Sequence, residues 1–249
     1  MTQRTLFITG ASRGIGAATA LRAAALGWDL ALNYTRDEAA AQVVAAQVRG
    51  LGRRALVLRG DVGVESDVLA MFAAIDAEFG ALHGLVNNAG VVDVASRVET
   101  MSVARLMRMF NINVIGSMVC AREAVKRMST KHGGAGGVIV NLSSAAARLG
   151  APGQYVDYAS AKGAIDTFTL GLAREVALEG IRVNAVRPGI IQTDIHASGG
   201  QPERAAQMAP SVPMQRVGSA DEVAQAIMWL LSDASSYTTG TVVDVTGGR

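Results

Sequence analysis

The sequence predicts one α/β domain, a doubly wound parallel sheet of seven strands with helices on both faces. Two observations lead to this fold class. Short runs rich in Val, Ile and Leu alternate with longer Ala-rich amphipathic runs along the 249 residues. Strands that are apolar at every position are typical of a parallel sheet that is buried on both sides. No internal repeat or linker divides the chain, so residues 1–249 are expected to form a single domain.

Strands and helices alternate through the first half of the chain. Each predicted strand is a short apolar run, and each predicted helix is an amphipathic run with many alanines. The first strand, TLFIT, leads through a glycine-rich turn into the first helix. The predicted strand and helix pairs are 5–9 with 15–26, 29–34 with 37–50, 54–62 with 64–79, and 84–90 with 103–129.

The second half continues this alternation and adds one irregular segment. The Gly-rich stretch 132–137 is short and lies between a helix and a strand, so it is expected to be a loop. Residues 193–217 contain two glycines and three prolines. We expect them to form a lid over the substrate, because long irregular segments of compact domains are typically functional or disordered. The predicted elements of this half are strand 136–144, helix 159–179, strand 181–189, helix 220–231 and strand 240–248.

Composition and charge exclude several classes of protein. The net charge is +2 and the basic residues are scattered, so a nucleic-acid-binding surface is not expected. The single Cys120 excludes an internal disulfide and a cysteine cluster, and His83, His132 and His196 lack the spacing of metal ligands. No segment approaches the ~20 apolar residues of a membrane span, and the first residues lack the apolar core of a signal peptide. We therefore expect a cytoplasmic protein without a metal site, in which Cys120 is a packing residue.

A glycine-rich turn, TGASRGIG at 9–16, lies where the first predicted strand meets the first helix. Glycines allow the backbone to approach a ligand closely, and the N-terminus of the helix attracts anions. The spacing G-x-x-x-G-x-G differs from the common G-x-G-x-x-G dinucleotide fingerprint. We interpret the turn as a phosphate-binding loop, with a strand–helix turn that binds no ligand as the alternative.

The end of the second predicted strand indicates which nicotinamide nucleotide is bound. NAD-binding domains typically place an acid there, about twenty residues after the loop, to hold the ribose 2′-hydroxyl. Here the position is Tyr34, Arg36 follows it, and Arg13 adds a second positive charge within the loop. Two arginines without an acid favour the 2′-phosphate of NADP(H). The alternatives are that both arginines are ordinary surface residues, or that a shifted register brings the acids at 37–38 close.

Tyr158 and Lys162, in YASAK, have the spacing of neighbours on one helix face. A free phenol has a pKa of ~10 and is a poor base at neutral pH. A nearby ammonium favours the phenolate, so we expect Lys162 to lower the pKa of Tyr158. Taken alone, the pair also fits the surface of an ordinary helix.

Together these motifs resemble the short-chain dehydrogenase/reductase family, with its Rossmann-type sheet, over nearly the whole chain. Among its members, the chain is most similar to the 3-oxoacyl-carrier-protein reductase-like and glucose-dehydrogenase-like branch. That branch contains many different substrates, so the resemblance indicates the chemistry better than the substrate. The other motifs that carry the resemblance are DV at 61–62, NNAG at 87–90, NVIG at 113–116, NLSS at 141–144, and RPG at 187–189 with Thr193.

The resemblance implies an oxidoreductase that interconverts a carbonyl and a secondary alcohol with NADP(H). It assigns the proton donor to Tyr158, a hydrogen bond to the substrate oxygen to Ser144, contacts with the nicotinamide ribose to Lys162, and support of a proton-relaying water to Asn113. The residues implied to bind the cofactor are Gly10, Ser12, Arg13, Gly14, Ile15, Gly16, Asn33, Tyr34, Arg36, Asp61, Val62, Asn88, Ala89, Gly90, Tyr158, Lys162, Pro188, Gly189, Ile191 and Thr193.

Two of these assignments have close rivals in the sequence. Ser143 and Ser144 are adjacent, and neighbouring strand residues face opposite ways, so only one can reach the site. Alignment through NLSS favours Ser144. Asn111 stands two residues before Asn113, and the family motif NVIG favours Asn113.

Three further side chains are weaker candidates for substrate contact. Tyr155 has no lysine four residues later, so with Gln154 it is interpreted as pocket lining. His196 follows TDI at the start of the expected lid and is either a substrate contact or an exposed surface residue.

The resemblance also implies a homotetramer, with the helices around 103–129 and 158–179 at its interfaces. The expected substrate is a 3-oxoacyl thioester, a sugar or another small carbonyl compound. Two other functions stay open: a catalytically silent dinucleotide-binding regulatory protein, and a structural interaction protein without a cofactor. The presence of Ser144, Tyr158 and Lys162 together favours the enzyme.

Overall fold

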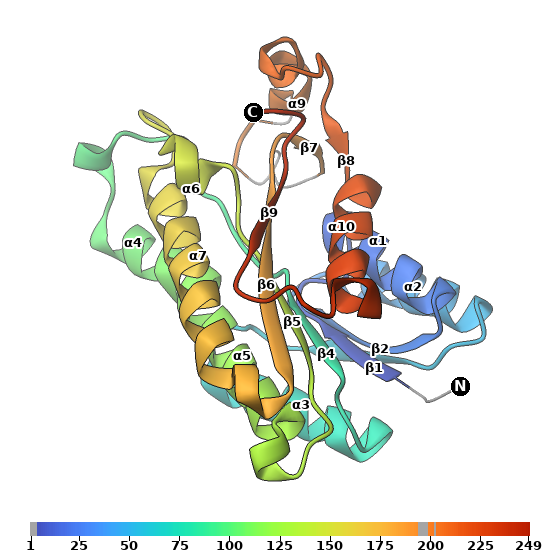
Figure 1. Cartoon of the computed structure of the whole chain (residues 1–249). Helices are drawn as coiled ribbons and strands as arrows, with labels where there is room; N and C mark the ends of the chain where they lie inside the picture. The colour runs from blue at the N-terminus through green and yellow to red at the C-terminus, as the bar shows by residue number, and fades with distance from the viewer. Residues whose placement is uncertain (1–3, 194–198, 202) are drawn as a thin grey trace.

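The computed structural model describes residues 4–193, 199–201 and 203–249. Within them, a parallel sheet of seven strands crosses the molecule in the order β3-β2-β1-β4-β5-β6-β9 (Figure 1). The order reverses between β1 and β4, as predicted for a doubly wound sheet. The strands are β1 Arg4–Ile8, β2 Trp28–Tyr34, β3 Ala55–Arg59, β4 Gly84–Asn87, β5 Gly137–Leu142, β6 Ile181–Pro188 and β9 Val242–Val245.

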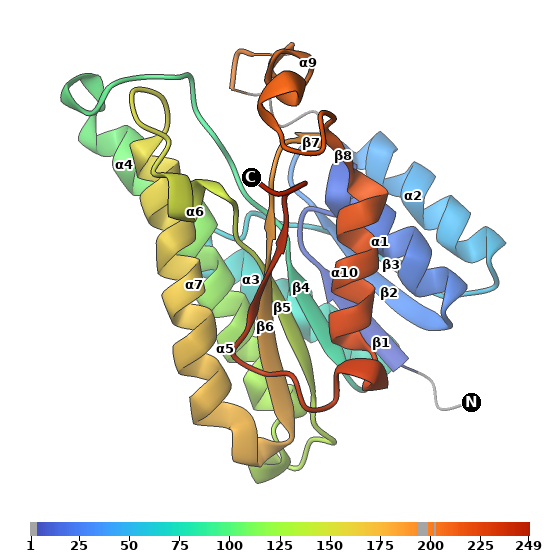
Figure 2. The same ribbon diagram turned by 45° about the horizontal axis from the view of Figure 1, so that its top comes forward.

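Helices cover both faces of the sheet (Figure 2). Each face of the sheet packs on its helices through a separate hydrophobic core. β1 contributes to both cores, because Leu6 and Ile8 pack on one side of it while Phe7 packs on the other. The Phe7 ring meets Phe72 edge-on at 5.3 Å between centroids. Successive side chains of a strand point to opposite faces, which explains why these strands are apolar throughout. The helices of the first face are α1 Gly14–Ala25, α2 Glu38–Gly50 and α10 Ala220–Leu231, and those of the second are α3 Glu65–Phe79, α5 Gly116–Met128 and α7 Val156–Val176.

The helical stretch expected at 103–129 is helical throughout 103–128 and contains a π-helical turn near its middle. α4, Val103–Phe110, passes into a π-helical turn, Asn111–Ile115, which leads into α5. Inside this turn the Asn113 side chain donates to the backbone carbonyl of Met109 at 3.0 Å. A side chain that bonds to the preceding turn competes with the α-helical backbone pattern, which accounts for the π-helical turn.

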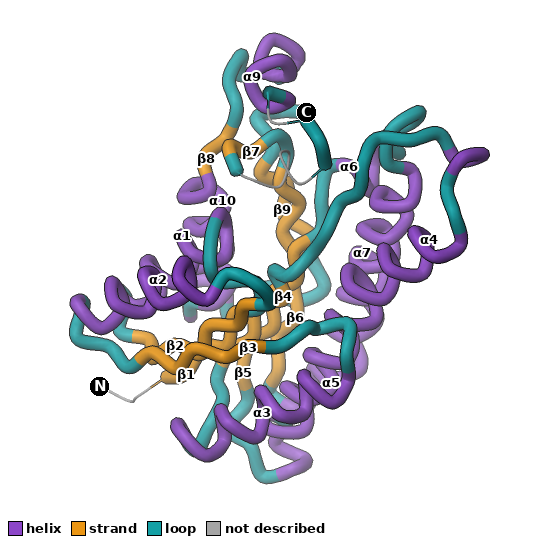
Figure 3. Tube along the Cα trace, turned by 180° about the vertical axis from the view of Figure 1, so that it is seen from behind, coloured by secondary structure: helices purple, strands orange, loops and turns teal. Residues whose placement is uncertain are grey.

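The segment expected to be an irregular lid, 193–217, contains a short helix in its described part. This helix, α9, spans Arg204–Met208 and lies beyond the carboxyl ends of the strands (Figures 1 and 3). Its alanine, glutamine and methionine residues are good helix formers. The sequence analysis gave more weight to the prolines of the segment and therefore predicted no helix here. A small pair of strands, β7 Ile191–Gln192 and β8 Gly218–Ser219, joins the two ends of the segment.

The loop after β1 is held against the loop after β4. Nδ2 of Asn88 donates to the carbonyl oxygens of Thr9, at 2.9 Å, and Gly10, at 2.8 Å. The backbone N–H of Gly10 donates to Oδ1 of Asn33 at 3.0 Å. A Cβ on Gly16 would lie 2.3 Å from the carbonyl oxygen of Gly10, so only glycine lets α1 begin this close to the loop.

We expect Gly16→Ala to lower the free energy of unfolding by about 1–3 kcal/mol, because the added methyl group collides with fixed backbone. Gly50→Ala is the matched control, since Gly50 is the exposed last residue of α2 with no atom within 4 Å of its would-be Cβ. This control should raise the free energy of unfolding by about 0.5–1 kcal/mol, because alanine is the better helix former. Urea unfolding of both variants tests the pair, and a Gly16→Ala protein as stable as its parent would contradict the packing described.

Candidate active site

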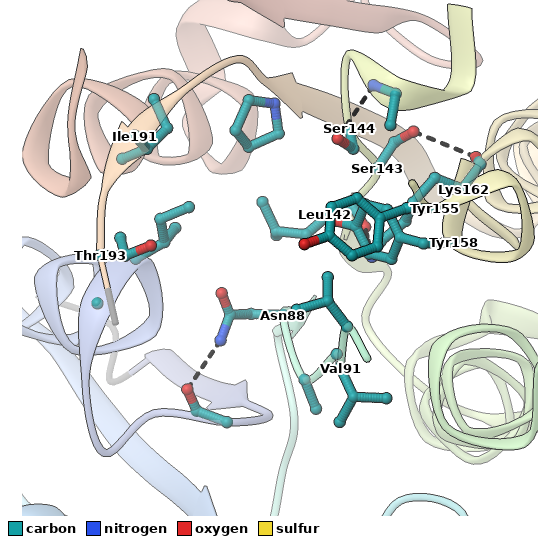
Figure 4. A pocket seen from close by; sticks show the side chains of 18 of the residues that line it. Asn88, Val91, Leu142, Ser143, Ser144, Tyr155, Tyr158, Lys162, Ile191 and Thr193 are labelled. Atoms are coloured by element: carbon teal, nitrogen blue, oxygen red, sulfur yellow. Dashed lines mark hydrogen bonds between the residues drawn. The ribbon is translucent and has the colours of Figure 1, made fainter. Parts of the chain in front are cut away.

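A cleft of about 1070 Å³ opens where the segments after β1, β2, β3, β4, β5 and β6 meet (Figure 4). This is the place that the glycine loop and the reversal of strand order predict for a ligand. Ile191 and Thr193 lie across it from Tyr155 and Tyr158. The expected site residues that line it are Gly10, Ser12, Arg13, Gly14, Ile15, Tyr34, Arg36, Asp61, Val62, Asn88, Ala89, Gly90, Ser144, Tyr158, Lys162, Pro188, Gly189, Ile191 and Thr193.

Three expected site residues lie behind the cleft wall instead of in it: Gly16, Asn33 and Asn113. Asn33 is fully buried, and besides accepting from the N–H of Gly10 it donates from Nδ2 to the carbonyl of Gly60 at 2.9 Å. Asn33 and Gly16 therefore shape the glycine loop from beneath.

The start of α1 has the features of an anion-binding site. Its N-cap, Arg13, makes no side-chain cap, and the first turn contains no acid. Gly14 and Ile15 of that turn line the cleft. The first N–H groups of a helix have no intrahelical acceptor, and the helix dipole favours negative charge there, so this turn suits a phosphate group.

The acids near the end of β2 are engaged in local contacts. Asp37 caps α2 by accepting from a backbone N–H of its first turn at 2.9 Å. Glu38 accepts a hydrogen bond from the phenol of Tyr34, and burial together with this contact raises the pKa of Tyr34. Arg13 and Arg36, by contrast, line the cleft with exposed side chains.

Tyr158 and Lys162 lie one turn apart on α7, and both line the cleft. The hydroxyl of Ser144, which follows β5, hydrogen-bonds the phenol of Tyr158. Ser143 is buried, and its Oγ donates to the backbone carbonyl of Lys162 at 3.2 Å (Figure 4). The structure thus places Ser144, and not Ser143, beside the phenol.

Burial controls the pKa values of this tyrosine and lysine. It raises the pKa of Tyr158, and the hydrogen bond with Ser144 opposes the rise only in part. The expected lowering by Lys162 is therefore not what the structure shows. The Nζ atom of Lys162 lies 5.6 Å from the ring centroid and donates instead to the carbonyl of Leu142 at 2.6 Å. Burial also lowers the pKa of Lys162 to about 8, against the opposite influence of Asp166.

Asn113 is fully buried and fixes the loop after β4. Its Oδ1 accepts from the N–H of Val91 at 3.1 Å, and its Nδ2 donates to the Val91 carbonyl at 3.0 Å. A Cβ on Gly90 would lie 2.7 Å from Oδ1 of Asn113 and 3.6 Å from Nζ of Lys162, so the two side chains meet at this glycine. Asn111, the rival candidate, donates to the backbone of the turn that precedes α3 at 2.8 Å.

A buried ion pair that the sequence analysis missed fixes the start of α7. The carboxylate of Asp157 is fully buried and accepts from Nε of Arg105 at 2.8 Å and from the N–H of Tyr158 at 2.9 Å. Arg105 also donates to the carbonyl of Val94 at 2.6 Å. The pair connects α4, the loop after β4 and the first turn of α7. An aspartate directly before the tyrosine of YASAK was the one signal that pointed to it.

We call the part of the cleft that is lined by α9 and by residues 149–155 its outer end, and the rest the inner cleft. Most side chains of the outer end belong to no motif that the sequence analysis identified. Gln154 and Tyr155 line the cleft, as expected. The guanidinium of Arg204 lies 5.3 Å from the centroid of the Tyr155 ring. The lining residues at this end that no motif indicated are Arg108, Leu149, Arg204, Met208 and Arg249.

The remaining expectations concern Cys120, metals, membranes and His196. Cys120 is fully buried in the core between α5 and the sheet, and burial raises the pKa of its thiol to about 12, as suits a packing residue. Within the described residues, no group of three or more His, Cys, Asp or Glu side chains is placed to hold a metal ion. The helices there do not combine the length and apolarity needed to cross a membrane. His196 lies outside the described residues.

Known proteins resemble this chain over almost its full length. Residues 10–249 match the family model described as Enoyl-(Acyl carrier protein) reductase. The uncharacterized oxidoreductase YgfF of Escherichia coli is 54% identical over 97% of this chain and 98% of its own. The chain belongs to the short-chain dehydrogenase/reductase family.

Two further relatives locate this short-chain dehydrogenase/reductase within its family. The 3-oxoacyl-[acyl-carrier-protein] reductase FabG of Staphylococcus aureus is 34% identical, over 98% of this chain and 97% of its own. A short-chain type dehydrogenase/reductase from Mycobacterium marinum has a crystal structure that matches with a TM-score of 0.92 at 33% identity, covering 98% of this chain and 94% of that one. The protein is therefore a FabG-like oxidoreductase with a Rossmann-type fold, whose family uses a nicotinamide dinucleotide and acts on CH–OH groups.

We expect Lys162→Met to stabilise the folded protein at pH 7. The pKa of Lys162 falls from 10.5 to about 8 on folding. Burying the charged ammonium at pH 7 therefore costs on the order of 3 kcal/mol of folding free energy. The variant is relieved of this cost but loses the hydrogen bond from Nζ to the Leu142 carbonyl, which offsets part of the gain. A net gain of about 1–2 kcal/mol should remain in the variant.

This gain should depend on pH in a defined direction. Between pH 8 and 10.5 the unfolded chain binds the Lys162 proton and the folded chain does not, so the stability of the parent rises with pH across this window. The advantage of Lys162→Met should shrink over the same window. Thermal unfolding of both proteins at pH 7, 9 and 10.5 measures it, and an advantage that grows with pH would refute the buried-charge account.

Proposed function

We propose that this protein is an NADP(H)-dependent enzyme that interconverts a carbonyl and a secondary alcohol. The observation that carries the proposal is the convergence of the Ser144 hydroxyl, the Tyr158 phenol and the buried Lys162 ammonium on one cleft. A protein that only bound a dinucleotide would not need a phenol and a hydroxyl held together beside it. Consumption of NADPH with a panel of aldehydes and ketones is the direct test, and binding without turnover would favour the silent regulatory protein.

The residues of the inner cleft fit a dinucleotide. The uncapped first turn of α1 and the glycine loop suit the pyrophosphate. Asp61 and Val62 suit the adenosine end, and Pro188, Gly189 and Thr193 suit the nicotinamide end. When bound, the reduced cofactor supplies a hydride to the substrate carbon.

The charges near the end of β2 favour NADP(H), with its 2′-phosphate, over NAD(H). Arg13 and Arg36 are exposed to the cleft, while Asp37 and Glu38 are engaged with a helix end and with Tyr34. Arginine–phosphate contacts are strong, charge-assisted hydrogen bonds.

In carbonyl reduction, the side chains of the protein orient the substrate and supply the proton that its oxygen receives. Ser144 Oγ donates to the substrate oxygen, and Tyr158 Oη transfers its proton to the developing alkoxide. The raised pKa of Tyr158 keeps the phenol protonated at pH 7, which is the form that this step requires. Lys162 binds the ribose hydroxyls through Nζ. Asn113, which meets Lys162 at Gly90, supports a water that returns protons to it.

We also propose that the protein is a cytoplasmic homotetramer and that a lid covers the cleft of each subunit. The lid is assigned to 193–217, of which 194–198 and 202 lie outside the described residues. In the described part, α9 lies over the cleft, and its Arg204 and Met208 line it. The substrate is a 3-oxoacyl thioester, as in the name of the FabG relative, or a sugar or other small carbonyl compound.

We expect Arg36→Asp to lower kcat/KM for NADPH by about tenfold to a hundredfold, because it replaces a charge-assisted contact with repulsion. The value for NADH should change little. Arg36→Lys retains the charge and should retain the preference for NADPH. Steady-state kinetics with both cofactors measure the selectivity, and a parent enzyme that prefers NADH would overturn the assignment.

Changing Tyr158 to Phe removes the transferable proton and leaves the ring. Turnover should fall by about 10²–10⁴-fold, the usual contribution of a positioned acid. The affinity for NADPH should stay nearly constant, because the hydroxyl acts on the substrate oxygen. Tyr237→Phe, at a fully exposed tyrosine, is the control and should be neutral. Near-normal turnover by Tyr158→Phe on a substrate of the parent would exclude the mechanism.

Light scattering should give a tetramer in solution. The expected interface helices expose large apolar side chains, which a second copy would cover. A mass that stays that of a monomer over a wide concentration range would remove this part of the proposal. The exposed apolar residues of α4, the π-helical turn, α5 and α7 are Val103, Met107, Ile115, Met118 and Leu170.

A further inference from the structure

We infer that the substrate of the proposed reductase carries a carboxylate, which the guanidinium of Arg204 binds at the outer end of the cleft. The inference rests on the proposed function, because it names the substrate class of the same site. Arg204 lies in α9, is partly buried and lines the cleft.

Charged side chains are distributed unevenly along the cleft. Among the described lining residues the acids are Asp37 and Asp61, which follow β2 and β3 at the cofactor end. The charged lining side chains of the outer end are the arginines Arg108, Arg204 and Arg249. A binding site with cations and without a described acid attracts negatively charged ligands and disfavours cationic ones.

Arg204 is held in place by neutral groups. Its Nη1 donates to the side-chain oxygen of Gln201 at 2.7 Å, and its guanidinium lies over the ring of Tyr155 at 5.3 Å from the centroid. Arg108, by comparison, donates to the carboxylate of Asp93 at 3.3 Å, so its charge is already partly balanced. Stacking on an aromatic ring fixes a guanidinium without neutralising it.

One edge of Arg204 is open for a ligand. Within the described part of the chain, Nη1 has a hydrogen-bond acceptor, while Nε and Nη2 have none. Two parallel N–H groups on a planar guanidinium match the two oxygens of a carboxylate. A sugar offers no such charge.

The position of Arg204 also limits the size of the substrate. Tyr155, whose ring contacts Arg204, immediately precedes α7, and Tyr158 lies in the first turn of that helix. Apolar side chains at Leu149 and Met208 line the same end of the cleft. The arrangement fits a short apolar body with the reacting carbonyl at one end and the carboxylate at the other.

The test compares oxo acids with their methyl esters, which keep the carbon skeleton and remove the charge. The probes are 4-oxopentanoate, 5-oxohexanoate and 6-oxoheptanoate, so that the separation of carbonyl and carboxylate is varied. The parent should show a kcat/KM at least about tenfold higher for the best acid than for its ester. Arg204→Met should abolish this preference by losing activity on the acid alone, and Arg204→Lys should keep part of it.

Arg216→Met is the matched control. Arg216 belongs to the same segment but already pairs with Glu222 at 2.7 Å, so its loss should leave the preference for the acid unchanged. A parent that reduces ester and acid equally would overturn the inference. So would an Arg204→Met variant that loses activity on both to the same extent, since that result would show only a packing role on Tyr155.

Failure of the proposed function has a different signature, namely no reduction of any acid or ester. In that case calorimetric titration with hexanoate and hexanamide, with and without NADP⁺, decides the question by binding alone. Binding of hexanoate that is lost in Arg204→Met supports the carboxylate site. Equal binding of acid and amide overturns it.

Discussion

The contact between the loops after β1 and β4 is the constraint on which the rest of the site depends. Oγ1 of Thr9 accepts from the backbone N–H groups of Asn88, at 3.0 Å, and Ala89, at 2.9 Å. Asn88 returns two hydrogen bonds to the carbonyls of Thr9 and Gly10. The same few residues thereby fix the glycine loop on one side and Gly90 on the other. Because Asn113 and Lys162 meet at Gly90, one interaction sets the geometry of both the glycine loop and the part of the cleft near Lys162.

Buried polar groups join the elements around Tyr158 and Lys162. Asn87 donates to Asn141 at 2.9 Å, and Asn141 donates to Thr169 at 2.9 Å, so one chain of hydrogen bonds links β4, β5 and α7. Asp157 and Lys162 anchor the first turns of α7 in the same way. Buried polar groups cost stability unless they have partners, and here the buried Oδ1 of Asn87 accepts no hydrogen bond among the described residues, whereas its Nδ2 is satisfied. Burial lowers the pKa of Lys162 to about 8, so its positive charge is unfavourable for folding at neutral pH.

The outer end of the cleft is built on different principles. Its walls come from short segments between the strands of the sheet, such as α9 between β6 and β9. Its charges lie on arginine side chains instead of backbone amides. The inner end presents backbone groups that suit a phosphate in any relative of this fold. Under the proposed function, the side chains around Tyr155 would select the substrate, and the residues of the inner cleft would carry out the chemistry.

The sequence by itself determined the fold class, the family and most of the residues that line the inner cleft. Apolar runs at every position required a sheet buried on both faces, and the motifs have fixed spacing because they lie on successive turns and strand ends. Only the tertiary structure decided which of Ser143 and Ser144 meets the phenol. It also showed that burial raises the pKa of Tyr158 and that the hydrogen bond with Ser144 opposes this rise. It also revealed the Arg105–Asp157 pair and the stacking of Arg204 on Tyr155, which join residues 52 and 49 positions apart. Periodicity and local motifs report neighbours along one element, whereas desolvation and contacts between elements exist only after the chain has packed.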